Sequence, residues 1–98
     1  MIKKVEGWKI FKEDYAEDGK LLDVKWSNID AGYDTAAVIV QLSRTSLARW
    51  NQFTVLAKVE RHDETIVFGR VDFIPTPSKA LEIAYSFMKR NKYIVKLK

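Results

Sequence analysis

The sequence predicts an α+β protein in which an antiparallel β-sheet of five to six strands packs on one C-terminal α-helix, in the order β-β-β-β-β-α-β. Several short segments alternate apolar and polar residues, as half-buried strands do, and turn-forming residues separate them. One later segment, residues 77–90, instead repeats apolar residues every three or four positions. Because 98 residues suffice for one hydrophobic core but hardly for two, we expect a single domain over residues 1–98.

The first two strands are predicted at residues 8–12 and 22–27. Four carboxylates lie between them, in residues 13–20, and the pair Asp18-Gly19 favours a tight reversal. A calcium loop is the alternative for this segment, but Lys25 stands where such a loop needs its bidentate glutamate. The segment is therefore predicted to be a solvated hairpin turn.

Three further strands are predicted in the middle of the chain. Residues 36–43 form a nearly continuous apolar run, which is typical of a central strand, and turn formers fill residues 28–35 before it. Residues 52–60 and 65–74 alternate again. Residues 44–51 break the pattern, so we expect them to form an exposed connection between two strands.

The helix has signals at both of its ends. Thr76 can cap its start, Pro77 suits the first helical position, and Asn91 is a plausible stop after two cations. The sequence therefore predicts a helix over residues 77–90. Its apolar stripe comprises Ala80, Leu81, Ile83, Ala84, Tyr85, Phe87 and Met88. A sixth strand is predicted at residues 93–97, with lysines typical of a sheet edge.

The two-residue period assigns the residues of each strand to the two faces of the sheet. The face toward the helix, and hence the core, is predicted to carry Leu22, Val24, Trp26, Val38, Val40, Leu42, Phe53, Val55, Ala57, Val59, Val67, Val71 and Phe73. The opposite face is predicted to carry Lys25, Ile39, Gln41, Thr54, Leu56, Lys58, Ile66, Phe68, Arg70 and Asp72. A face that mixes cations, amides and large apolar groups either binds something or is covered by a loop or a second subunit.

The composition is that of a globular protein, with 47% hydrophobic and 31% charged residues. The absence of cysteine excludes disulfides, thiolate metal sites and cysteine nucleophiles. The net charge is uneven, at −2 over residues 1–37 and +6 over residues 38–98. Because residues 1–8 lack the apolar run of a signal peptide and no stretch is long enough for a membrane span, a cytoplasmic location without membrane contact is predicted.

Catalysis is not predicted. His62 is the only histidine and lies beside Asp63 in a predicted turn, where an exposed imidazole is more common than a catalytic one. The chain has no glycine-rich phosphate loop, no nucleophile elbow and no spaced set of metal ligands. We therefore expect a protein that is not an enzyme and that has no cofactor and no metal.

The strand segment 68–73 partly resembles the RNP1 segment of RNA-recognition motifs, in which aromatic rings on an open sheet stack on bases. Arg70 stands where that segment has an aromatic residue, and Ile66 and Val67 stand where it has a basic residue and a glycine. The family is therefore not assigned. The alternative for this segment is a central strand whose Phe68 lies under a loop.

Two arginines and a tryptophan, Arg44, Arg49 and Trp50, lie in the predicted connection. This combination suits both base stacking and protein interfaces, and Trp50 is expected to be substantially exposed. The cations of residues 89–98 are instead ascribed to the helix dipole and to the solubility of an edge strand.

The predicted function is that of a small non-catalytic binding protein that engages nucleic acid, preferably single-stranded, through the open sheet face and the connection at residues 44–51. The alternative is a protein-interaction or regulatory module, either a homodimer that buries the same face or a cap on another protein's surface. The candidate binding residues are Arg44, Arg49, Trp50, Lys58, Phe68 and Arg70.

Overall fold

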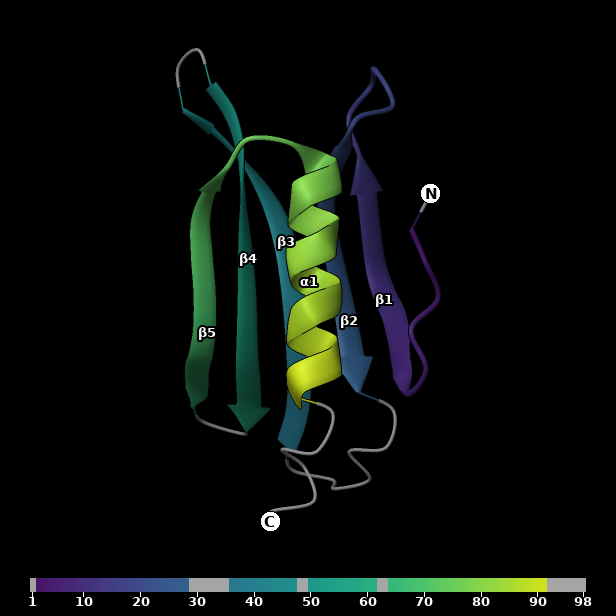
Figure 1. The fold of residues 1–98 in the computed structure, drawn as a ribbon, viewed down its shortest axis with the longest axis vertical. Helices are drawn as coiled ribbons and strands as arrows, with labels where there is room; N and C mark the ends of the chain where they lie inside the picture. Colours follow the sequence, from purple (N-terminus) through teal and green to yellow (C-terminus); the bar gives the residue numbers. More distant parts are fainter. Residues whose placement is uncertain (1, 29–35, 48–49, 62–63, 92–98) are drawn as a thin grey trace.

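The computed structural model describes residues 2–28, 36–47, 50–61 and 64–91. Five antiparallel strands form one sheet in chain order, β1-β2-β3-β4-β5, and one helix lies across a face of that sheet (Figure 1). The strands are β1 (Trp8–Tyr15), β2 (Leu21–Asn28), β3 (Ala36–Leu47), β4 (Trp50–Arg61) and β5 (Thr65–Ile74). The predicted α+β fold is confirmed. The predicted sixth strand at residues 93–97 lies outside the described residues.

The helix α1 (Pro77–Asn91) begins where the sequence predicts and ends one residue later. Thr76 caps it, because the amide of Lys79 donates a hydrogen bond of 3.2 Å to the Thr76 hydroxyl oxygen. The helix contacts β3, β4 and β5 through its apolar stripe. The buried members of that stripe are Ala80, Leu81, Ala84, Phe87 and Met88.

The hairpin of β3 and β4 corrects the expected connection at residues 44–51. The two strands stay paired until Leu47 meets Trp50, so only residues 48–49 separate them. Pairing of β3 with β2 ends at Ser43, and pairing of β4 with β5 begins at Phe53. The hairpin therefore ends in a two-stranded ribbon that projects beyond the end of β5 (Figure 1). Such a ribbon needs no buried face, so its residues can lose the apolar alternation and still form strands.

Two irregularities in β5 correct the predicted core. Val71 lies opposite Val55 and Ile74 opposite Phe53, so Asp72 and Phe73 together oppose the single residue Thr54. Phe73 has a φ of 59° and is 72% exposed. Ile74 is buried instead, in the core position that was predicted for Phe73. The prediction of Phe73 as a core residue is therefore wrong.

The second irregularity lies at the other end of β5. Ile66 pairs with Val59, which is buried on the helix side, and Val67 pairs with Lys58 on the opposite side. Ile66 and Val67 have thus exchanged the faces predicted for them, and Val67 is 49% exposed rather than part of the core. Only the regular stretch between the two irregularities, Gly69 to Val71, keeps the predicted alternation.

The hairpin of β1 and β2 has its turn where the sequence predicts it, although β1 extends as far as Tyr15. The amide of Gly19 donates to the carbonyl oxygen of Ala16 at 2.9 Å, and Gly19 has φ of 83°, a conformation that glycine adopts without strain. A register shift beside this turn buries Leu21 instead of Leu22, which is only half-buried. The prediction of Leu22 as a core residue is therefore wrong.

The remaining core predictions hold on the side of the sheet that faces α1. The buried sheet residues that the sequence identified are Val24, Trp26, Val38, Val40, Leu42, Phe53, Val55, Ala57 and Val59. Trp8 joins this core from β1, and Val71 packs against it while partly exposed. Within the described part of the chain, no helix covers the other side of the sheet, which we call the open face (Figure 1).

Candidate functional site

Antiparallel pairing arranges the side chains of the open face in rows that run across the strands. One row, taken from β1 to β5, is Lys12, Lys25, Gln41, Leu56 and Arg70. The neighbouring row is Lys9, Ser27, Ile39, Lys58 and Val67. These two rows hold five cations and no carboxylate. We call them the cationic band.

Carboxylates flank the cationic band on both sides. The row that lies next to the Lys12–Arg70 row contains Asp14, Asp23, Ser43 and Thr54. Asp72 also belongs to this flank, because the hydroxyl of Thr54 donates a 3.0 Å hydrogen bond to it. Glu60 lies on the other flank, one row beyond Lys58. Since neighbouring strands lie about 4.8 Å apart and alternate residues about 6.6 Å apart, the band is roughly 19 Å long and one row spacing deep.

Three cations of the band reach toward these flanks. Lys12 Nζ lies 3.0 Å from an oxygen of Asp23, and Arg70 Nε lies 2.9 Å from an oxygen of Asp72. Lys58 Nζ lies 3.0 Å from an oxygen of Glu60. The other two cations, Lys9 and Lys25, form no ion pair with any residue of the described chain.

Two of these contacts shift pKa values. The hydrogen bond to Asp23 raises the pKa of Lys12, and the hydrogen bond from Arg70 lowers the pKa of Asp72. Both shifts move the pKa further from neutral pH, where a lysine and an aspartate are already charged. An exposed ion pair contributes little stability, so an anionic ligand can compete most readily for Arg70, whose side chain is 62% exposed. The side chain of Lys58 is only 14% exposed.

Phe68 supplies an aromatic ring at the β5 end of the band. It is the extra residue at the irregularity beside Val67, and its side chain is 37% exposed. Arg70, two residues further along the same strand, has a side chain that is 62% exposed. The structure thus brings together three of the six predicted site residues, Lys58, Phe68 and Arg70.

The other three do not join them. Arg44 pairs with Phe53, a core residue, and therefore belongs to the helix side, where it lines a cavity of about 610 Å³ next to the start of α1. Arg49 lies outside the described residues, and so does the side chain of Trp50, whose backbone pairs with Leu47. The expected exposure of Trp50 stays a prediction.

Sequence reasoning missed two members of the cationic band, Lys9 and Lys12. Both lie on β1, and Lys12 falls opposite Lys25 only because the register between β1 and β2 shifts after Ile10. The alternation within a single strand gives no signal for such a shift. The middle of the band is also less open than expected, since Ile39 is only 5% exposed although it lies outside the core cluster.

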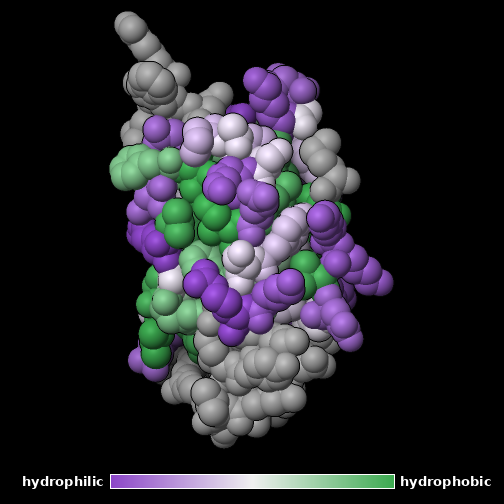
Figure 2. Space-filling view, in the orientation of Figure 1, coloured by the Kyte–Doolittle hydropathy of each residue, from purple (hydrophilic) through white to green (hydrophobic). Residues whose placement is uncertain are grey.

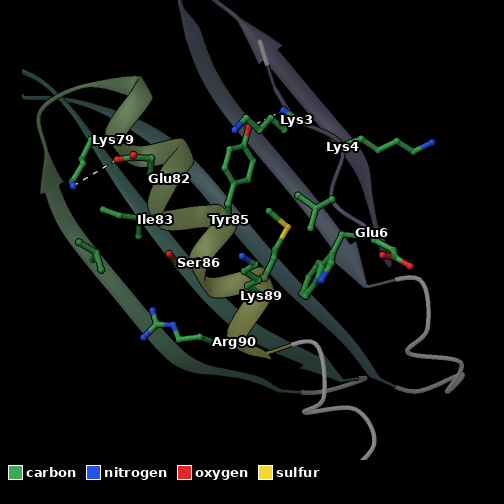
Figure 3. A pocket seen from close by; sticks show the side chains of 14 residues that line it. Lys3, Lys4, Glu6, Lys79, Glu82, Ile83, Tyr85, Ser86, Lys89 and Arg90 are labelled. Atoms are coloured by element: carbon green, nitrogen blue, oxygen red, sulfur yellow. Dashed lines mark hydrogen bonds and ion pairs between the residues drawn. The ribbon is translucent and has the colours of Figure 1, made fainter.

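A second cationic surface surrounds α1 on the helix side (Figure 3). It is a groove of about 870 Å³ whose charged lining residues are Lys3, Lys4, Glu6, Lys79, Glu82, Lys89 and Arg90. These cations do not converge, because Arg90 lies on the opposite side of α1 from Lys3 and Lys4 (Figure 3). Lys79 contacts Glu82 at 3.6 Å, and Arg90 stacks 5.2 Å above the ring of Phe87. The groove is therefore a weaker candidate than the cationic band.

A metal site and a membrane-spanning helix are both absent from the described part of the chain. It contains no group of three or more histidine, aspartate or glutamate side chains placed to hold a metal ion. No helix in this part of the chain is long enough and apolar enough to cross a membrane. Comparison of the chain with protein-family models, curated proteins and solved structures gave no match.

Proposed function

We propose that the protein is a small non-catalytic binding protein that engages single-stranded nucleic acid on its open face, in the cytoplasm as the sequence predicts. The observation that carries this proposal is the cationic band, which crosses all five strands and ends beside the ring of Phe68. Cations that follow a phosphate backbone supply most of the affinity of such proteins, and aromatic rings add stacking on the bases.

The acidic flanks support a single strand over a duplex. The two backbones of B-DNA are separated by grooves roughly 6 Å and 12 Å wide, so a duplex placed on the band would bring its second backbone over the flanking rows. Those rows hold Asp14, Asp23 and Asp72 on one side and Glu60 on the other. One backbone that follows the band across the strands meets five cations, and neither row contains a carboxylate.

The test is a salt titration of binding to a labelled single strand and to the matching duplex, followed by fluorescence anisotropy. We expect the single strand to bind more tightly, and the logarithm of its affinity to fall linearly with the logarithm of salt concentration. Contact with all five cations would give a slope of about −3.5. Lack of binding at low salt, or preference for the duplex, would contradict the proposal.

Variants of the band should weaken binding without unfolding the protein. Phe68→Ala should cost about 1 to 3 kcal/mol of binding free energy through lost stacking, and Arg70→Ala should also flatten the salt slope by about 0.7. Tyr15→Ala is the matched control for the ring, because Tyr15 is 49% exposed but lines the helix-side cavity. Lys79→Ala on α1 is the control for the charge. Unfolding by Phe68→Ala would assign that ring to the core.

Removal of a flanking carboxylate should have the opposite effect. In Asp72→Asn the guanidinium of Arg70 loses its anionic partner, so single strands should bind more tightly, while the salt slope, which already includes Arg70, should stay close to its native value. Glu82→Gln removes one carboxylate from α1 instead and should leave binding unchanged. Anisotropy titrations of the two variants make the comparison, and unchanged or weaker binding by Asp72→Asn would remove Arg70 from the phosphate path.

A protein-interaction module is the second candidate, and a different observation favours it. Among the large hydrophobic side chains that the described structure exposes, four lie on β5, namely Ile66, Val67, Phe68 and Phe73. Apolar side chains gathered on one edge are typical of a surface that meets another protein. If no nucleic acid binds at low salt while the protein associates through β5, this second function is selected.

A further inference from the structure

The two edges of the sheet differ in how they are protected. Edge strands expose backbone hydrogen-bonding groups, and proteins commonly block them with charged side chains or proline. Four charged residues lie on β1, whereas β5 has only Arg70 and Asp72 and no proline. In Figure 2 the left margin, where Figure 1 places β5, shows hydrophobic side chains with hydrophilic ones between them. The edge at β5 is thus the less protected one.

We propose that β5 pairs antiparallel with β5 of a second copy of this chain, about a two-fold axis that passes beside Val71, and so joins two sheets into one. Extension of a sheet across an unpaired edge is a common mode of protein association. The proposal concerns the strand edge and does not depend on the binding of nucleic acid.

The charges on β5 select this register. In a symmetric antiparallel pair centred on Val71, Arg70 lies opposite Asp72 of the partner subunit on both sides of the axis. A pair centred on Arg70 would instead place two arginines opposite each other, and like charges in that position are destabilising. A pair centred on Gly69 would place Asp72 opposite an isoleucine. Only the first of these registers is electrostatically self-complementary.

The local geometry leaves Arg70 able to bind two carboxylates. Its Nε donates to both oxygens of Asp72 in its own chain, at 3.1 and 2.9 Å. A guanidinium has five N–H donors, so the two terminal nitrogens remain for Asp72 of the partner subunit. The central stretch from Gly69 to Val71 is also the regular part of β5, between its two irregularities. A symmetric axis perpendicular to the sheet leaves both open faces on the same side of the joined sheet.

Sedimentation velocity over a range of protein concentrations, without nucleic acid, tests the proposal. We expect reversible dimerisation of the native chain. Arg70→Glu makes both positions acidic and Asp72→Arg makes both basic, so each variant alone should dimerise at least about tenfold more weakly. An equimolar mixture of the two variants should recover a dimer, because each acidic strand then faces a basic one, and the double swap Arg70→Glu/Asp72→Arg should also dimerise.

Lys79→Glu and Glu82→Lys make the same charge changes on α1 and should leave dimerisation unaltered. Circular dichroism checks each variant for folding, since Asp72→Arg also loses the bond to Thr54. Arg70→Glu, at an exposed position, tests the register even if Asp72→Arg disturbs the fold. A monomer at every concentration, a dimer insensitive to Arg70→Glu, or a mixture no better than its components would each overturn the proposal.

Discussion

Replacement of Phe87 by alanine should lower the free energy of unfolding by about 3 to 5 kcal/mol, a large part of the stability of a small domain. The ring is 7% exposed and lies over Gly69, where an added Cβ would come within 3.0 Å of its Cε1 atom. The ring thus fills the space that the glycine leaves above β5. Because Gly69 has no side chain to move into the resulting cavity, the loss should fall near the upper end of this range.

Chemical denaturation of the variant measures this loss. Ser86→Ala, one residue away on the exposed side of α1, is the matched control and should change stability by less than about 0.5 kcal/mol. A loss below about 1 kcal/mol for Phe87→Ala would mean that the helix does not hold the sheet through this ring.

The helix was the most predictable element because its signals are local. Thr76 and Pro77 mark its start in the sequence itself, and the spacing of its apolar residues sets the face that is buried. No tertiary contact is needed to recognise either signal. The predicted end differed from the observed end by a single residue.

The strands were easier to locate than to orient. The limits of β5 agree with the prediction, yet Val67 and Phe73 were placed on the wrong face. Each error follows from one extra residue in the strand, because the residues before and after such a residue no longer follow one continuous alternation. Phe73 adopts a positive φ, which is uncommon for a residue of its size, so nothing in its sequence context announced the irregularity.

The candidate site was predictable only within one strand pair. Lys58, Phe68 and Arg70 come from β4 and β5, whose face assignment near Arg70 was correct. The full cationic band depends on the registers of all four strand pairs, including a shift in β1 that brings Lys12 opposite Lys25. Such registers are set by packing between strands, which periodicity along one strand does not report.

Trp26 should be the second large contributor to stability. Its side chain is only 1% exposed, and its ring meets the ring of Tyr85 edge-on with centroids 6.3 Å apart. The hydroxyl of Tyr85 in turn accepts a 2.8 Å hydrogen bond from the backbone amide of Lys3, so this pair also holds the segment that precedes β1. We expect Trp26→Ala to cost about 3 to 5 kcal/mol in urea denaturation.

A change of Trp26 to phenylalanine should cost much less than the loss of ring volume suggests. The indole Nε1 is buried without a hydrogen-bond partner in the described structure, and a buried unpaired donor costs about 1 to 3 kcal/mol. Phenylalanine removes that donor while it keeps an aromatic ring against Tyr85. Trp8→Phe is the matched control, because Trp8 is buried as deeply but its indole nitrogen is not a buried unpaired donor. Equal losses in the two variants would show that the unpaired N–H of Trp26 does not destabilise the fold.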